Sequence, residues 1–357
     1  MGKIAHFLPV FARFVETAQK FNSTFVKIYR LQYWDTSAKI RTQRSTKQQA
    51  ERSTKMKKDV YEIVTERFLE KLEQGIIPWR RPWKMVGGAF PAYPLGSKKP
   101  YGFINQMLLD FEYGEFATFE TIKRNGGKVK KGEKSKLIVG WIHTTEKIKD
   151  ENGEAVVDDD GNEQYKDRFA LRYYQVFNVY TQVEGLKDDI DIEDETSALI
   201  ESDFVPGDAY QMANDIIVNY TDREQITFNN GDISNSAYYL PSADSITVPN
   251  MSQFEDVNEY YSTAFHEMVH STGHQSRLDR GLEKKAAHGS NEYSREELVA
   301  EIGSAALMNI CGIESEDTFK NSAAYIQSWS KALKDSPKMI VYASAQAQKA
   351  VEYIIEK

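Results

Sequence analysis

Residues 260–274 read YYSTAFHEMVHSTGH and contain three of the six histidines in the chain of 357 residues. His266 and His270 are four positions apart, so one turn of a helix would place both imidazoles on the same face. Apolar residues recur at helical spacing through this segment and predict a helix over about 256–272: Val257, Tyr261, Ala264, Phe265 and Met268. The pattern therefore predicts a packed helix that presents two imidazoles side by side.

The residues between and beside these histidines indicate a metal site. His266-Glu267-x-x-His270 is the HExxH pattern of zinc hydrolases, in which two imidazoles bind Zn²⁺ and the glutamate serves as general base. The pattern also arises by chance, so a third ligand is required. Metzincins place a histidine about ten residues after the first. That position is Ser276, and His274 is eight residues after His266, so the spacing excludes the metzincin class.

A second helix, predicted over 294–310, offers carboxylates for the third position. Glu297 and Glu301 are four residues apart and share a face of this helix. The segment resembles the second active-site helix of thermolysin-like gluzincins. That resemblance implies Glu297 as a zinc ligand and Glu301 as the carboxylate that hydrogen-bonds a zinc-bound histidine. Two alternatives stay open: Glu297 could instead form a capping box with Ser294, and His274 could be the third ligand.

The composition excludes several classes of protein. Hydrophobic residues make up 41% of the chain and aromatic residues 12%, which is enough for packed cores and excludes a mostly disordered chain. No apolar run is long enough to span a membrane. The single cysteine, Cys311, excludes an internal disulfide and a CxxC metal site. We expect a cytoplasmic protein without a membrane partner, and the length predicts two domains.

Charge divides the chain unevenly. Residues 1–58 carry 13 Lys and Arg against three acids, whereas the remainder carries 32 basic and 50 acidic residues. We predict that residues 1–55 form a basic, poorly packed extension or reflect a start placed too early. The alternative is an electrostatic arm for nucleic acid, and the arginine-rich composition also resembles a transit peptide.

The rest of the chain predicts an α+β protein with two domains. A helix over 56–73 precedes β-rich segments at 137–142 and 169–183, which turn motifs connect into an antiparallel meander. Eight acids and one lysine between 187 and 203 predict an exposed linker over 187–205. Helices predominate beyond it. The predicted domains are therefore 56–186, an antiparallel sheet with helices, and 206–357, which contains the HExxH helix.

The first of these domains has the residue types of a single-strand DNA interface. Seven basic residues and one acid lie between Thr121 and Lys136, and aromatic residues alternate with basic ones after residue 78. Aromatic rings stack on unpaired bases, and lysines follow phosphates without reading a sequence. The alternative is that the tryptophans are core and the lysines a solvated face. The candidate DNA-binding residues are Trp79, Arg80, Arg81, Trp83, Lys84, Tyr101, Lys128, Lys130, Lys131 and Lys134.

Longer motifs resemble a known family. Residues 237–280, with Ala-Tyr-Tyr-x-Pro, Val-Pro, the HExxH helix, Thr-Gly-His and Arg-Leu-Asp-Arg, are similar to the zincin-like, gluzincin-type metallopeptidase domain of ArdC-type antirestriction proteins. Ile-Pro-Trp-x-x-Pro-Trp, Tyr-Gly-x-Ile-Asn and Gly-Gly-x-Val-Lys-Lys-Gly-Glu resemble the single-stranded-DNA-binding domain of the same family, which also occurs fused to plasmid primases. The resemblance covers about residues 56–330. The basic extension and the acidic residues 158–160 depart from it.

The resemblance implies a protein that protects incoming mobile DNA from host restriction. It would bind single-stranded DNA without strong sequence preference and cleave an unknown protein or peptide. The sequence leaves the oligomeric state open, and a monomer is the default. Zn²⁺ held by His266, His270 and Glu297 would activate a water molecule, with Glu267 as the base. Two other functions fit the same residues. One is a non-enzymatic DNA-masking protein with a structural or vestigial metal, and the other is a protease toxin or processing enzyme.

Overall fold

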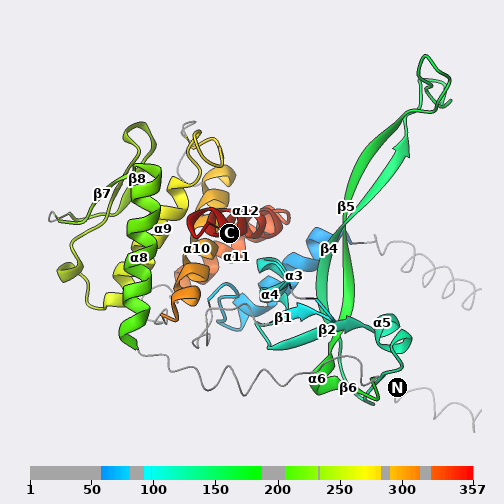
Figure 1. The fold of residues 1–357 in the computed structure, drawn as a ribbon, viewed down its shortest axis with the longest axis horizontal. Coiled ribbons are helices and arrows are strands. Elements are labelled where there is room, and N and C mark those ends of the chain that lie inside the picture. Colours follow the sequence, from blue (N-terminus) through cyan, green and yellow to red (C-terminus); the bar gives the residue numbers. More distant parts are fainter. Residues whose placement is uncertain are drawn as a thin grey trace, which may run out of the picture. The chain divides into compact units, whose positions relative to one another are not determined.

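The computed structural model describes residues 58–80, 92–97, 99–186, 206–231, 234–282, 290–313 and 323–356. The predicted extension 1–55 and linker 187–205 lie outside these ranges. The described residues from Asp59 onward form one compact unit of mixed helix and sheet, which confirms the α+β class (Figure 1). Within the described ranges, every helix is too short or too polar to cross a membrane.

The N-terminal half consists of a helix, α3 (Val60–Glu73), and a four-stranded sheet. Asp59 caps α3 in a reciprocal capping box with Glu62. The sheet has the strand order β1-β2-β5-β4, in which β1 is parallel to β2 and the other pairs are antiparallel. The strands are β1 (Ala92–Pro94), β2 (Gly114–Thr118), β4 (Lys136–Lys147) and β5 (Tyr165–Asn178).

Helix α4 (Phe103–Leu108) secures the free edge of this sheet. Asn105 donates from its side-chain amide to the carbonyl of Val139 over 2.8 Å and accepts the Val139 N–H over 2.8 Å. A side chain thus replaces a neighbouring strand at that position of β4. Smaller elements complete this half: α5 (Phe119–Arg124), β3 (Lys128–Val129), α6 (Val179–Gln182) and β6 (Val183–Glu184), with β3 and β6 antiparallel.

The C-terminal half combines helices with a small three-stranded sheet of order β7-β9-β8. Strands β7 and β9 are parallel, and β8 is antiparallel to β9. Two helices predicted from the sequence, over 256–272 and 294–310, are present as α9 and α10. The elements are α8 (Pro206–Glu224), β7 (Thr227–Asn229), β8 (Tyr238–Leu240), η2 (Pro241–Ala243), β9 (Ser245–Thr247), η3 (Met251–Gln253), α9 (Val257–Ser271), α10 (Asn291–Cys311), α11 (Ala323–Asp335) and α12 (Met339–Ile354).

Helices α9 and α10 pack closely because a glycine lies between them. A Cβ atom at Gly303 would come within 2.7 Å of a methyl carbon of Val269. Only glycine therefore allows the observed approach of the two helices. This approach sets the distance between the side chains that α9 and α10 carry.

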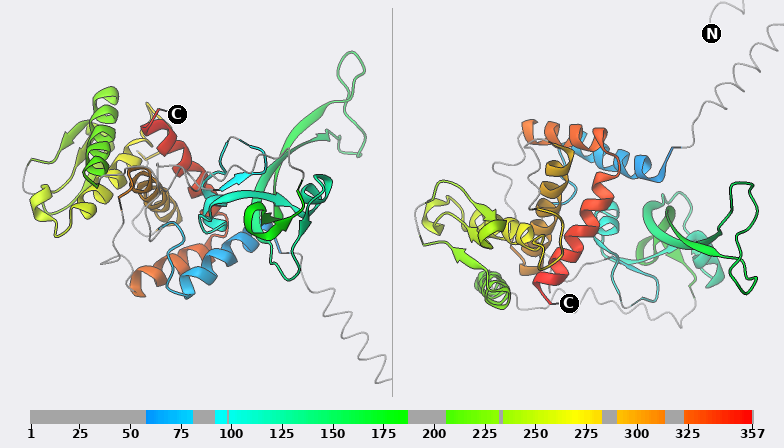
Figure 2. Two further views of the ribbon diagram at one scale, coloured as in Figure 1. Left: turned by 60° about the horizontal axis from the view of Figure 1, so that its bottom comes forward. Right: turned by 90° about the horizontal axis from the view of Figure 1, so that it is seen from above.

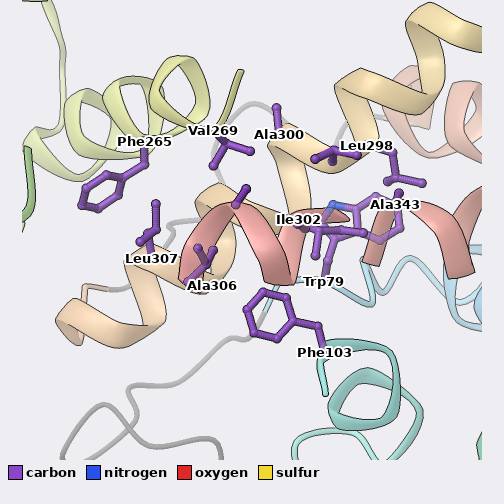
Figure 3. Packing of buried hydrophobic residues seen from close by; sticks show 14 of the residues in the cluster. Trp79, Phe103, Phe265, Val269, Leu298, Ala300, Ile302, Ala306, Leu307 and Ala343 are labelled. Carbon is purple, nitrogen blue, oxygen red and sulfur yellow. The ribbon is translucent and has the colours of Figure 1, made fainter. Parts of the chain in front are cut away.

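One hydrophobic core extends through both halves. Figure 3 shows Trp79, which follows α3 in the sequence, in the same buried cluster as Leu298, Ile302 and Ala343. Helix α3 packs against α11 and α12, and the Thr65 hydroxyl donates to the carbonyl of Pro337 over 2.7 Å. Residues 60–80 therefore pack with the C-terminal helices. The boundary between domains 56–186 and 206–357 stays a prediction.

Candidate metal centre

The start of α10 frees Glu297 to face α9. The helix begins at Asn291, and the Ser290 hydroxyl accepts the N–H of Tyr293 over 3.1 Å as its N-cap. Ser294 and Glu297 consequently lie inside the helix, and the capping box considered for this pair is not formed. The N-terminal N–H groups of α10 are capped by an earlier serine than the sequence pattern indicated.

Three side chains from α9 and α10 bring their donor atoms together. His266 Nε2 lies 3.1 Å from His270 Nε2, and the Glu297 carboxylate oxygens lie 3.6 Å from each of these nitrogens. A tetrahedral zinc ion with bonds of about 2.0–2.2 Å holds its ligand atoms roughly 3.3–3.6 Å apart. The two imidazoles and one carboxylate therefore fit a divalent cation, and in the described part of the chain they form a cluster that could hold one.

Glu267 follows the first of these histidines on α9. Its side chain is buried, and its negative charge acts on both His270 and Tyr293. The carboxylate consequently lies near His270, one of the three donors, and near Tyr293. A group in this place can accept a proton from a molecule at the metal centre.

A third carboxylate, that of Glu296, orients His270 through the ring nitrogen that faces away from the other donors. The Nδ1–H of His270 donates to Glu296 Oε1 over 3.1 Å, which leaves Nε2 as the metal-facing nitrogen. Arg280 donates to both oxygens of Glu296, over 2.9 and 2.7 Å, and its side chain is only 2% exposed. Arg280 also donates to the carbonyl of Val269 and to the hydroxyl of Thr272, so it fixes the end of α9 as well.

This arrangement shifts two pKa values. Burial lowers the pKa of His270, but the hydrogen bond to Glu296 and the surrounding carboxylates outweigh burial and raise it above the ordinary value. Burial raises the pKa of Glu296, but the hydrogen bonds from His270 and Arg280 outweigh burial and lower it. Glu296 is thus held as a carboxylate against the imidazole.

Glu301 lies elsewhere than its predicted place beside a zinc-binding histidine. The Tyr325 hydroxyl donates to Glu301 Oε2 over 2.9 Å, and Arg80 Nη2 lies 3.8 Å from the same oxygen. The guanidinium of Arg80 also lies over the Tyr325 ring. Glu301 thus connects α10 to α11 and to the segment after α3, while Glu296 makes the histidine contact. The reason is that Arg280, from the loop after α9, draws Glu296 towards His270.

A buried arginine fixes the other motif residues of this half. Arg277 donates to both carboxylate oxygens of Asp244 and to the carbonyl of Ser271. Tyr239 donates to Asp244 over 2.7 Å. His274 contacts Ser276 over 2.7 Å, away from the three donors. The Tyr-Tyr and Arg-Leu-Asp-Arg motifs therefore support the metal centre by holding the loop that follows α9.

The structure removes two residues from the predicted DNA interface. Trp79 is 1% exposed and packs edge-on against Trp329, with ring centroids 5.7 Å apart. A ring enclosed in the core cannot stack on a base. Arg80 is partly buried between Glu301 and Tyr325. Trp79 thus belongs to the core, as the alternative for the tryptophans held, and Arg80 lies beside Glu301 and Tyr325.

The other DNA candidates within the described residues fall into two groups. Tyr101 is half-buried against the sheet, and burial raises its pKa to about 12. Four lysines are exposed on β3 and on the loop that leads into β4, and Lys130 Nζ donates to the carbonyl of Thr181 over 2.8 Å. Arg81, Trp83 and Lys84 lie outside the described residues. The lysines are Lys128, Lys130, Lys131 and Lys134.

Several exposed or site-facing residues were not predicted from the sequence. Trp141, Phe169 and Tyr173 are large aromatic side chains on the surface of β4 and β5. The available signal was the spacing of Phe169 and Tyr173, which are four residues apart in a β-rich segment and so share a face of a strand. Arg280 and Glu296 were visible only as parts of motifs, because their pairing depends on how the loop after α9 folds back.

Two family models match the chain in succession. The N-terminal domain of anti-restriction factor ArdC matches residues 58–177, and a zincin-like metallopeptidase domain matches residues 215–346. Two DNA primases TraC of Escherichia coli are 33% and 34% identical to this chain, and each match covers 84% of it. The chain spans only 27% and 20% of the lengths of these primases. A protein of Sinorhizobium fredii is 29% identical, and the match covers 83% of this chain and 91% of that protein.

Two solved structures of one protein also match this chain, and each match covers nearly the whole length of that protein. The metal-free structure of the antirestriction ArdC protein from plasmid R388 is 31% identical, with a TM-score of 0.59. It matches 84% of this chain, and the match covers 97% of the R388 protein. The Mn(II)-bound structure of that protein matches at 30% identity with the same TM-score. With its ArdC-type N-terminal domain followed by a zincin-like domain, this chain belongs to the ArdC family of antirestriction proteins.

Proposed function

We propose that this antirestriction protein acts in the cytoplasm, binds single-stranded DNA and carries a metal-dependent peptidase centre. The observation that supports the peptidase is the convergence of three donors, His266, His270 and Glu297, beside the buried carboxylate of Glu267. Zn²⁺ is the proposed metal, since two imidazoles and one carboxylate form a common catalytic zinc set. The substrate would be a protein or peptide.

The proposed mechanism assigns one task to each side chain. A divalent cation at this centre would supply Lewis acidity towards a carbonyl oxygen and make water more acidic. Glu267 accepts the proton of the attacking water on its carboxylate and delivers it to the leaving amine. Glu296 holds the Nδ1 proton of His270 and so keeps the other nitrogen directed towards the centre.

The proposed DNA binding rests on the N-terminal domain. The four exposed lysines around β3 provide positive charge that follows phosphates without reading bases. The solved relative is named an antirestriction protein, and the primases of Escherichia coli contain a region similar to this chain. Protection of transferred DNA would then begin with its coverage as a single strand.

A second function, DNA masking without catalysis, is favoured by one observation. The R388 protein was crystallised both without metal and with Mn(II), and both structures match this chain with the same TM-score. In that protein the fold does not require the metal. Masking would need the N-terminal domain and leave the metal centre as a structural or vestigial site. The toxin or processing-enzyme alternative gains no comparable support.

A matched pair of histidine variants tests the metal centre. His266→Ala should abolish stoichiometric metal in the purified full chain, because it removes one of three donors. His274→Ala is the control, since this partly buried histidine contacts Ser276, and it should keep one metal ion per chain. Elemental analysis after dialysis gives the result. Equal loss of metal from both variants would place His274 in the ligand set and contradict the proposed centre.

A further inference from the structure

Strands β4 and β5 extend as a two-stranded ribbon beyond the sheet (Figures 1 and 2). They pair from Lys136 with Val176 to Lys147 with Tyr165, whereas β2 pairs with β5 only over residues 176–178. Most of the ribbon therefore has no third strand. We call this segment, residues 137–175, the arm.

The register of the arm places its exposed rings on one face. Residues directly opposite in an antiparallel pair share a face, and the face repeats every second residue. Val139 pairs with Tyr173, Trp141 with Leu171, and His143 with Phe169, so all three rows lie on the same side. Trp141 is 56% exposed, Phe169 68% and Tyr173 46%. We call Trp141, His143, Phe169 and Tyr173 the aromatic face.

The spacing of these rows suits stacked bases. Successive rows on one face are separated by two residues, or about 7 Å. Bases in a stacked strand rise by about 3.4 Å, so one base fits between rings of neighbouring rows. His143 and Phe169 already lie together, with ring centroids 5.0 Å apart. An unpaired base offers a flat apolar surface of the kind that these rings leave exposed to water.

The distribution of charge favours binding of a polyanion at the base of the arm. We call residues 128–136, which precede the arm, its root. Residues 128–136, which lead into β4, contain five lysines and one glutamate. Arg172 is exposed on the same section of β5 as Tyr173. The tip, residues 149–163, contains seven acids and one lysine. Phosphates are therefore attracted to the root and repelled by the tip, and the rings lie between these two regions.

We propose that the aromatic face is the surface on which unpaired bases of single-stranded DNA stack. The lysines at the root neutralise phosphates, and the acidic tip ends the footprint. Duplex DNA does not offer the faces of its bases, so the face selects single strands. This proposal rests on the proposed DNA-binding function and moves its stacking residues from the buried Trp79 to the arm.

The test measures fluorescence anisotropy of a labelled oligo-dT strand with the full chain. Trp141→Ala and Phe169→Ala should each weaken binding roughly 5- to 150-fold, the loss expected for one stacked base. The dependence of affinity on salt should stay unchanged, because the phosphates neutralised are the same. Tyr165→Ala is the matched control, since this exposed ring lies on the same face beside the acidic tip, and it should bind like the parent.

An abasic strand of equal length separates stacking from other causes. It keeps the phosphates and lacks the bases, so parent and Trp141→Ala should bind it equally. The melting temperatures of the variants should match that of the parent, because the replaced side chains are exposed. Asp158→Asn, Asp159→Asn and Asp160→Asn together should not weaken binding to oligo-dT.

Each contrary result has a distinct meaning. Parent-like binding of oligo-dT by both Trp141→Ala and Phe169→Ala would overturn the stacking face while DNA binding itself stands. Equal losses on oligo-dT and on the abasic strand would also overturn it. If the parent chain binds neither strand, the proposed DNA-binding function fails and the stacking face fails with it.

Discussion

His270 and Glu296 form a hydrogen-bonded pair, in which Nδ1 of the imidazole lies 3.1 Å from Oε1 of the carboxylate. Arg280 holds that carboxylate through two nitrogens. The pair links the last turn of α9 to the start of α10, and it orients a histidine whose other nitrogen faces Glu297. Removing the carboxylate should therefore affect metal binding without removing a ligand.

Glu296→Gln should lower metal affinity about 10- to 100-fold, the effect of losing a carboxylate that orients a metal-binding histidine. Glu297→Gln should lower it further, since a donor atom is exchanged. Glu301→Gln is the matched control from the same helix, and its affinity should stay close to that of the parent. Competition with a chromogenic chelator measures all three. An equal loss in Glu296→Gln and Glu301→Gln would remove the special role of Glu296.

The pair also predicts how the stability of the metal-free protein depends on pH. The raised pKa of His270 stabilises the fold fully below the ordinary value of 6.5, and this contribution is lost as pH rises through the raised pKa. The lowered pKa of Glu296 stabilises the fold above its ordinary value of 4.5, and this contribution is lost as pH falls through the lowered pKa. Both contributions are therefore present together between pH 4.5 and 6.5.

Thermal unfolding of the metal-free chain across about pH 3–9 measures this dependence. Glu296→Gln should be destabilised most between pH 4.5 and 6.5 and should approach the parent at both extremes. A difference in melting temperature that is constant across the whole range would show that the pair does not titrate as described.

Gly303→Ala tests the approach of α9 to α10. The new methyl would meet Val269, so the variant should lose about 1–3 kcal/mol of unfolding free energy through overpacking. Metal affinity should fall too, because the two helices carry different ligands. Adding Val269→Ala makes room for the methyl and should recover part of both losses. A double variant no better than the sum of its single variants would contradict this account.

Charge reversal tests the root of the arm. Lys130→Glu with Lys131→Glu should weaken single-strand DNA binding and reduce its dependence on salt by about 0.7 for each phosphate that is no longer neutralised. Lys149→Glu, at the acidic tip, is the control and should keep the salt dependence of the parent. Binding titrations at several salt concentrations give the slopes. If Lys149→Glu reduced the salt dependence of DNA affinity as much as the root variant does, phosphates would bind along the whole arm. That result would contradict a footprint that ends before the acidic tip.

The sequence predicted the position of the two histidines on α9 better than it predicted the burial of Trp79, and the reason is physical. His266 and His270 are related by one turn of a helix, so their spacing alone determines a shared face. The contact between Glu296 and His270 depends instead on a loop that returns Arg280 to α10. Burial of Trp79 likewise depends on residues more than two hundred positions away, including Trp329.

The arm was predicted only in part for a similar reason. The strand expected over 137–142 extends to Lys147 in the structure. Its outer residues are polar and exposed, so they lack the burial pattern by which strands are recognised. Backbone hydrogen bonds to β5 hold these residues in the strand. Such bonds place few constraints on side-chain type, so they cannot be predicted from the sequence of one strand. The sequence therefore shows the aromatic residues but does not predict that they share one face, because that depends on the register of β4 with β5.

Glu267→Gln tests the central claim, that the converging donors form a peptidase centre, most directly. The substitution keeps His266, His270 and Glu297, so metal content and single-strand DNA binding should equal those of the parent. Loss of the general base should reduce hydrolysis of dye-labelled casein and of a mixed peptide library about 100- to 10,000-fold. Protection of transferred DNA, measured in the same variant, should fall with hydrolysis if catalysis is the function, and should persist if DNA masking is. Metal-loaded Glu267→Gln that cleaves these substrates at the rate of the parent would contradict the claim.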